Sequence, residues 1–190
     1  MTEVELVGNA LCLDFANSTN WRPVAQRDWL ASPAGAVTWA RAVGHPVDDD
    51  PSLRFTLPVA RDLREAVFRV FQPLAHGERP SPDDLDIVHA AYAEGVARGR
   101  FVDDGATFRL SWTDPQTLRV LLWDVAASAV GLLTQGPLHR LGECASCPWL
   151  FLDTSKNGRR RWCSMATCGS RDKARRYHAA HGPGGEAERP

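Results

Sequence analysis

Apolar residues recur at three- and four-residue steps through most of the first 140 positions, a spacing that places them on one face of a helix. The clearest run lies between residues 57 and 74. Its apolar members are Ala60, Leu63, Val67, Val70, Phe71 and Leu74. The same spacing continues through residues 85–96 and 118–132. The pattern predicts a mainly helical N-terminal region.

Polar residues mark where these helices begin and end. Ser32-Pro33 and Ser81-Pro82 each combine an N-cap serine with a proline at the first helical position. Asp114-Pro115 is expected to open the last long helix, which ends before Gly136-Pro137. A shorter helix through residues 29–30 is expected to be capped by Asp28.

A small β element interrupts the helices. Strands are predicted near residues 100–102 and 107–112, joined by the turn pair Asp104-Gly105. The composition is that of an ordinary globular protein, with 44% hydrophobic and 24% charged residues. The expected fold class is therefore mainly α (α+β).

The pattern changes after residue 137, where aliphatic positions become sparse and four of the five cysteines fall. A segment of this kind cannot form a sufficient hydrophobic core and needs another source of stability. Cys144 and Cys147 form a C-x2-C pair, and Cys163 and Cys168 form a C-x4-C pair fifteen residues later. This arrangement is typical of a four-cysteine zinc site.

With four protein ligands the zinc ion has no open position for water, so the predicted metal is structural. The alternative is a set of buried or redox-active cysteines, which two pairs around a polar segment make less favourable. Cys12 lies in an apolar run, and we expect it to be a small core residue.

Charge is divided unevenly along the chain, although its formal net charge is only −1. Residues 1–141 carry 13 Lys and Arg against 18 Asp and Glu, and residues 142–190 carry 9 against 5. The basic side chains predicted to bind nucleic acid are Lys156, Arg159, Arg160, Arg161, Arg171, Lys173, Arg175 and Arg176. A solvated surface, or docking on the acidic N-terminal region, remains the alternative interpretation.

The local pattern in the cysteine-rich segment predicts a hairpin and a helix. One strand is expected over residues 149–152 and a second over 159–162, with a helix from Met165 to about His178 capped by Ser164. On that helix Arg171, Arg175 and His178 share one face. Arginine suits both phosphate and guanine edges, so these arginines are expected near bases and the loop arginines near phosphates.

The segment from Glu143 to His178 resembles the CGNR zinc finger, including the blocks at residues 151–155 and 160–165. Its signature tetrapeptide corresponds to residues 168–171, where Ser170 replaces the usual Asn. Residues 11–18 (LCLDFANS) resemble the ABATE domain that usually precedes this finger. The resemblance implies a stress-responsive transcription regulator with a treble-clef-like finger. We therefore expect a regulatory domain over 1–137, a finger over 138–181 and a flexible tail over 182–190.

Several function classes are not expected. No nucleophile elbow, phosphate-binding glycine loop or metalloprotease motif occurs, so the protein is not expected to be an enzyme. The start of the chain shows no secretory signal, and the apolar stretch at 118–133 is interrupted by Arg119 and Asp124. A cytoplasmic location, where thiols stay reduced, follows as an expectation.

The N-terminal region is expected to sense a small-molecule effector or to mediate homodimerisation. Helix-bundle clefts commonly hold ligands. The residues predicted to line such a cleft are Asp14, Asn17, Asn20, Trp21 and Arg22. Two alternatives to DNA binding remain open, namely RNA binding by the same finger and a zinc-stabilised protein–protein interaction module without nucleic acid.

Overall fold

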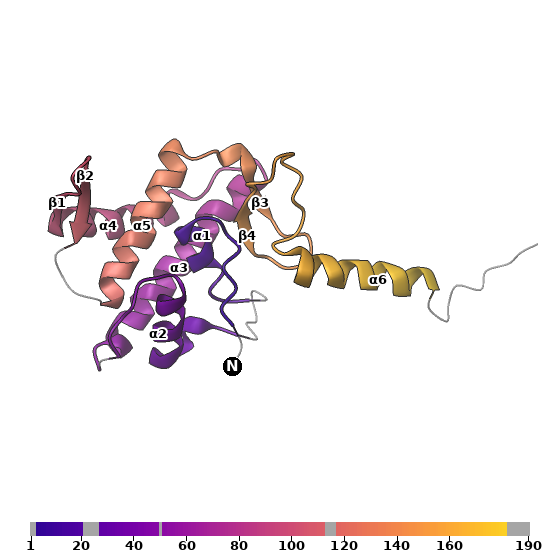
Figure 1. Ribbon diagram of the computed structural model, residues 1–190, viewed down its shortest axis with the longest axis horizontal. Helices are drawn as coiled ribbons and strands as arrows, with labels where there is room; N and C mark the ends of the chain where they lie inside the picture. Colours follow the sequence, from indigo (N-terminus) through magenta and orange to yellow (C-terminus); the bar gives the residue numbers. More distant parts are fainter. Residues whose placement is uncertain (1–2, 21–26, 50, 113–116, 182–190) are drawn as a thin grey trace, which may run out of the picture.

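The computed structural model describes residues 3–20, 27–49, 51–112 and 117–181. The fold is mostly helical with two small hairpins, as Figure 1 shows, which confirms the expected class. The elements in chain order are α1 (Leu11–Ala16), η1 (Trp29–Ala31), α2 (Pro33–Ala42), α3 (Leu53–Ala75), α4 (Pro82–Arg98), β1 (Gly99–Asp103), β2 (Phe108–Trp112), α5 (Leu118–Gln135), η2 (Leu138–Arg140), β3 (Leu141–Glu143), β4 (Leu150–Leu152), η3 (Met165–Gly169) and α6 (Ser170–His181).

Side-chain caps start the helices where the sequence predicts them. Ser32 accepts a hydrogen bond from the Gly35 N–H at 3.2 Å, and Ser81 caps α4 in the same way. Asp28 caps the short 3-10 helix η1. The predicted opening of α5 at Asp114-Pro115 lies outside the described residues, and within them Thr117 is the N-cap.

The main core surrounds α1, which lies between α3 and α5 (Figure 1). Phe15 of α1 packs edge-to-face on Trp39 of α2, with ring centroids 5.4 Å apart. Burying a side chain of this size stabilises the fold by roughly 1.5–3 kcal/mol. Cys12 is fully buried in this core, and burial raises the pKa of its thiol to about 12. Its expected role as a core residue is confirmed.

Helix α5 is long and apolar enough to cross a membrane if length and composition alone are considered. In this structure it is a core helix, because its apolar residues pack against α1 and α4. Its interrupting residue Arg119 forms an ion pair with Glu94 of α4 at 2.9 Å.

The predicted hairpin around Asp104-Gly105 is present. Strand β1 pairs antiparallel with β2, and Phe101 lies opposite Leu110. The turn is closed by Asp103, which accepts a hydrogen bond from the Gly105 N–H, and Gly105 takes a positive φ of 89° that suits glycine. Hairpin β1–β2 and helix α6 lie at opposite ends of the long axis (Figure 1).

The second hairpin corrects the prediction for the cysteine-rich segment. Strand β4 pairs with β3, and Leu141 lies opposite Leu152, whereas residues 159–162 form no strand. The pairing is local because β3 and β4 flank the C-x2-C turn directly. Leu141 and Leu150 belong to the same hydrophobic core as the N-terminal helices. The hairpin is therefore packed into the body of the protein.

Candidate zinc centre and basic helix

The first cysteine pair lies at the tip of the β3–β4 hairpin. The Cys144 N–H donates to the Trp149 carbonyl at 2.9 Å, which closes a tight turn around the C-x2-C sequence. The next N–H, that of Ala145, donates to the Arg161 carbonyl at 2.9 Å. These bonds connect the turn to the chain segment that carries the second pair. Cys144 and Cys147 lie in one cluster with that pair.

The second pair spans a wide helical turn. Ser164 follows Cys163 and caps this turn by accepting a hydrogen bond from the Thr167 N–H at 3.4 Å. The turn, η3, has π-helical geometry and carries Cys168 into the helix that follows. The N-cap and the wide turn together account for the x4 spacing. The predicted N-cap at Ser164 and the predicted helix start at Met165 are confirmed, and the helix continues to His181 as α6.

The four sulfurs of Cys144, Cys147, Cys163 and Cys168 lie within 4.8 Å of one another. Three measured Sγ–Sγ distances are 3.5 to 3.6 Å. A tetrahedral zinc ion with bonds of about 2.3 Å requires sulfurs about 3.8 Å apart. The cluster therefore matches the size and the donor set of a structural Zn²⁺ site.

The four thiols lie close enough to change one another's acidity. Hydrogen bonds from Cys147 and Cys163 lower the pKa of Cys144 well below its usual range. The same contact with Cys144 raises the pKa of Cys147 to about 12, and the pKa of Cys163 is raised for the same reason. Each of these shifts arises mainly from the hydrogen bonds that one sulfur makes to another within the cluster. A dication at the centre supplies the charge that full ionisation requires.

Asp153 shapes the loop between the two pairs. It is buried, and its carboxylate accepts hydrogen bonds from the backbone N–H groups of Ser155 and Arg160, both at 2.8 Å. Hydrogen bonds from Ser155 and from the Arg160 backbone hold the pKa of Asp153 below its usual range. These hydrogen bonds fix the conformation of the loop, because residues 159–162 do not pair as a strand.

Arg160 turns inward, unlike its neighbours in the arginine run. Its guanidinium donates to the carbonyls of Val7 and Cys163 and lies 4.3 Å from the centroid of the Phe151 ring. Arg159 and Arg161 are exposed. Arg160 therefore stabilises the fold, and Arg159 and Arg161 are available at the surface. The composition of the run does not show this difference.

A set of hydrogen bonds joins the zinc module to the N-terminal segment. The Asn17 side chain donates to the Leu150 carbonyl at 2.8 Å and accepts from the Leu150 N–H at 2.9 Å. The Trp149 indole N–H donates to the Thr19 carbonyl at 2.8 Å. The Leu152 N–H donates to the Gly8 carbonyl at 2.8 Å. Asn17 thus binds β4 as a neighbouring strand would.

The residues predicted to line an effector cleft have several separate roles. Asp14 accepts a hydrogen bond from the Gly8 N–H at 2.7 Å, and burial raises the pKa of its carboxyl. Asn17 is committed to Leu150, and Asn20 accepts from the Arg27 N–H at 2.8 Å. Trp21 and Arg22 lie outside the described residues.

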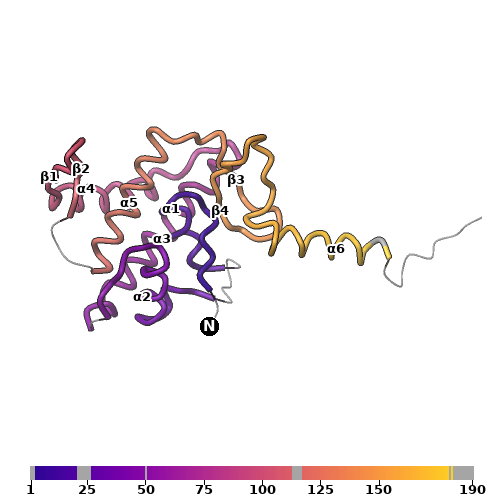
Figure 2. Tube along the Cα trace, in the orientation of Figure 1, coloured from indigo at the N-terminus to yellow at the C-terminus, as the bar shows by residue number. Residues whose placement is uncertain are grey.

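Helix α6 leaves the body at the zinc cluster and extends away from it, as Figures 1 and 2 show. Its neighbour in packing is the π-helical turn η3. Asp172 forms ion pairs with Arg175 at 3.0 Å and with Arg176 at 3.2 Å. Seven of the eight predicted nucleic-acid-binding side chains are exposed: Lys156, Arg159, Arg161, Arg171, Lys173, Arg175 and Arg176.

Ser170, at the position of the signature asparagine, begins this helix. Its hydroxyl donates to the Met165 carbonyl at 3.1 Å, which fastens the start of α6 to the π-helical turn. The side chain is exposed and lies outside the sulfur cluster. The replacement of Asn by Ser therefore leaves the four thiols in place.

Comparison with known families gives two matches in tandem. Residues 9–136 match the ABATE family, which is described as "Putative stress-induced transcription regulator". Residues 140–181 match the CGNR zinc finger. No curated protein matches the chain. The second match contains all four clustered cysteines, and the first contains Asn17, which holds the finger in place.

Proposed function

Because the chain belongs to the ABATE family of transcription regulators and carries a CGNR zinc finger, we propose that it binds duplex DNA through α6 and the finger's basic loop. The observation that carries this proposal is the exposed basic helix anchored at one end by the four-cysteine cluster. A transcription regulator needs a surface that reaches DNA, and α6 is a suitable one.

The length and surroundings of α6 support a role in binding. It has 12 residues, and isolated helices of this length are marginal in water. Residues 173–179 are all exposed, so little packing stabilises them. A helix of this kind gains stability from a partner. The DNA major groove admits one α-helix, and 12 residues extend about 18 Å along it.

The charge of this surface favours phosphate as the partner. Residues 156–178 contain eight Lys and Arg residues and one acidic residue, Asp172. It pairs with Arg175 and Arg176, but exposed ion pairs contribute only about 0–1 kcal/mol. Phosphates can therefore compete for these arginines. We assign Arg171 and Arg175 to base edges, and Lys156, Arg159 and Arg161 to phosphates, and we leave Arg160 out of the interface.

The test is a salt-resolved binding assay with the full-length zinc-loaded protein and a DNA duplex. The three cations assigned to phosphates should make log affinity fall against log salt with a slope of about −3, and neutralisation of phosphates by all seven exposed cations would give about −6. Replacing Arg171 and Arg175 by Glu should weaken binding about 100-fold while zinc content is unchanged. Arg109→Glu, on the distant hairpin β1–β2, is the matched control.

Two other results would reassign the surface. Tighter binding of an A-form RNA duplex than of DNA would make the protein an RNA-binding one. Binding of an acidic peptide, with no binding of either duplex, would identify a protein-interaction module. Affinity for DNA that is independent of salt would contradict the proposal.

The remaining parts of the proposal concern regulation. The ABATE part senses an effector or mediates homodimerisation, and the finger responds through the contacts that Asn17 and Trp149 make between the two parts. We place the protein in the cytoplasm, because a reduced four-cysteine zinc site requires a reducing compartment. No catalytic role enters the proposal, in keeping with a family of transcription regulators.

A further inference from the structure

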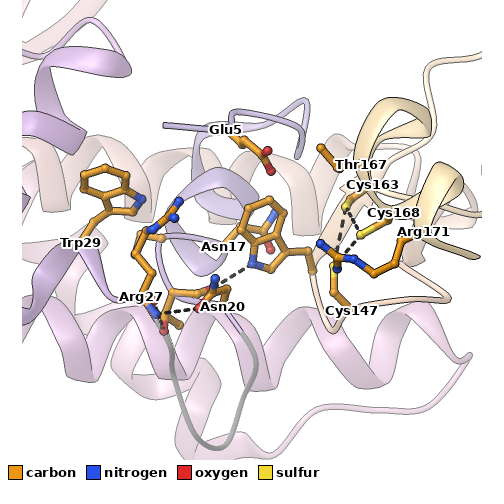
Figure 3. Close-up of a pocket in the computed structure, with 13 residues that line it drawn as sticks. Glu5, Asn17, Asn20, Arg27, Trp29, Cys147, Cys163, Thr167, Cys168 and Arg171 are labelled. Atoms are coloured by element: carbon orange, nitrogen blue, oxygen red, sulfur yellow. Dashed lines mark hydrogen bonds between the residues drawn. The ribbon is translucent and has the colours of Figure 1, made fainter. Parts of the chain in front are cut away.

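A pocket of about 240 Å³ lies where the N-terminal segment meets the zinc module (Figure 3). One side is formed by Asn20, Arg27 and Trp29 of the N-terminal part. The opposite side is formed by Thr167 of the π-helical turn and by Arg171 in the first turn of α6. A molecule in this pocket would therefore touch both halves of the protein.

Two hydroxyl groups at the pocket have no hydrogen-bond partner within the described part of the chain. They are Ser18 Oγ and Thr167 Oγ1. Ser18 is only 2% exposed, and both residues line the pocket. Buried polar groups in native proteins are nearly always hydrogen-bonded, so an unpaired pair at one cavity indicates a missing polar partner. Both oxygens are shielded from solvent, so a small molecule with hydrogen-bonding groups would pair with them once the Ser18 and Thr167 side chains rotate toward the cavity.

Arg27 is presented to the pocket by a fixed backbone. Its N–H donates to the Asn20 side chain at 2.8 Å, and its carbonyl accepts hydrogen bonds from the Asn20 N–H and from Thr19 Oγ1. The Arg27 guanidinium carbon lies 5.9 Å from the Trp29 ring centroid. A guanidinium held beside an aromatic ring is suited to a carboxylate attached to a flat apolar body.

The opposite end of the pocket has different electrostatics. Cys147, Cys163 and Cys168 line it, and four thiolates around Zn²⁺ carry a formal charge of −2. Arg171 lies beside these thiolates and offsets part of their charge, and Glu5 adds a negative charge to the lining, so an anionic group is favoured at Arg27. The aromatic wall of Trp29 and Trp149 then faces the uncharged part of the ligand.

We propose that this pocket binds a small aromatic carboxylate, with the carboxylate at Arg27, the ring against Trp29 and Trp149, and polar contacts to Ser18 and Thr167. Arg171, which we assign to DNA above, also lines the pocket. A ligand in the pocket packs beside Arg171 and restricts its side chain, so an occupied pocket lowers DNA affinity. This last step rests on the proposed DNA binding, whereas the ligand site does not.

The experiment is calorimetric titration of the full-length, zinc-loaded protein with benzoate, and with benzamide as the uncharged isostere. Saturable binding of benzoate at least tenfold tighter than that of benzamide is expected, because only benzoate carries the charge. Inorganic phosphate serves as the second anion. Phosphate bound as tightly as benzoate would overturn the aromatic part of the proposal, and saturable binding of neither anion would overturn the site.

Three variants locate the ligand. Arg27→Ala should weaken benzoate binding at least tenfold, and Arg109→Ala on hairpin β1–β2 should leave it unchanged. Ser18→Ala should also weaken benzoate binding, yet leave the melting temperature without ligand unchanged or higher, because it removes an unpaired buried hydroxyl. A Ser18→Ala protein that loses stability but binds benzoate normally would contradict the assigned role of Ser18.

The DNA assay separates the two proposals. Saturating benzoate should weaken duplex binding about fivefold or more, and saturating DNA should weaken benzoate binding by the same factor. Benzoate binding without DNA binding would sustain the pocket and overturn the proposed function. DNA binding without benzoate binding would sustain the proposed function and overturn the pocket. Independent binding of both would overturn the coupling through Arg171.

Discussion

The N-terminal body and the C-terminal module are stabilised by different means. The body has a continuous apolar core around α1, α3 and α5. The module has a small cluster in which three of the four fully enclosed members are cysteines, the fourth being Phe151. Its other supports are hydrogen bonds to the N-terminal segment. The body should therefore tolerate loss of the metal, and the module should not.

The largest expected effect comes from removing a zinc ligand. Cys163→Ser should abolish stoichiometric zinc binding and unfold the loop and α6, because metal binding in such modules provides the folding free energy. The measurement is zinc content together with limited proteolysis, which should remove the C-terminal segment and leave the body intact. Cys12→Ala, at the buried cysteine outside the cluster, should retain zinc. A zinc-free variant with a protected α6 would contradict this account.

The matching change in the body targets a buried ion pair. Arg64 is 4% exposed and binds Asp28 through two hydrogen bonds of 2.5 and 3.0 Å. Asp28→Asn should lower the free energy of unfolding by up to about 3 kcal/mol, at the low end for such pairs because the Asp28 side chain is 20% exposed. Zinc content should not change. Chemical denaturation of the wild type and the variant measures the difference.

The same pair gives a pH dependence. Burial acts to raise the pKa of Asp28, but the hydrogen bond and charge of Arg64 outweigh it and lower that pKa. A lowered folded-state pKa means that the stabilisation is complete above the unfolded value of about 4 and is lost as pH falls through the folded-state value. The Asp28→Asn difference should therefore shrink below pH 4. A difference that grows in acid would contradict the assignment.

A smaller effect is expected at the junction between the two regions. Asn17→Ala removes both hydrogen bonds to Leu150 and leaves two buried backbone groups unpaired, at a cost of about 1–3 kcal/mol. Hydrogen exchange should speed up in β4 more than in α5, while zinc remains bound. Asn9→Gly removes an exposed hydrogen bond to the same strand without straining the positive φ of 59° at that position, and it should cost less. If the amides of β4 were equally protected from hydrogen exchange in both variants, Asn17 would not be the residue that holds β4 in place.

Local features of the fold were predictable from the sequence. The serine and aspartate caps at Ser32, Ser81 and Asp28 act within three residues, so the pattern contains everything that decides them. The zinc ligands were predictable for the same reason, because a C-x2-C turn brings two sulfurs together by itself. Strand β3 was missed, since Leu-Gly-Glu has too few residues to show a period of two.

Contacts between distant parts of the chain were not predictable. Asn17 and Leu150 are 133 positions apart, and the sequence around each residue contains no pattern that indicates contact with the other. Arg160 has the same side chain as Arg159 and Arg161, and only the position of the Val7 carbonyl separates its role from theirs. Two of the predicted effector residues, Asn17 and Asn20, line a pocket, but Arg27 and Trp29 were overlooked because their place beside the zinc cluster depends on tertiary packing.

The bonds from Val7, Gly8 and Asn17 to the finger have a practical consequence for protein engineering. A graft that transfers residues 138–181 alone to another regulator would expose Leu141 and Leu150 and would remove the Val7 carbonyl from the partners of Arg160. A chimaera that keeps these contacts has to carry residues 7–17 and helix α3 with the finger, so the portable unit of this protein is discontinuous in the chain.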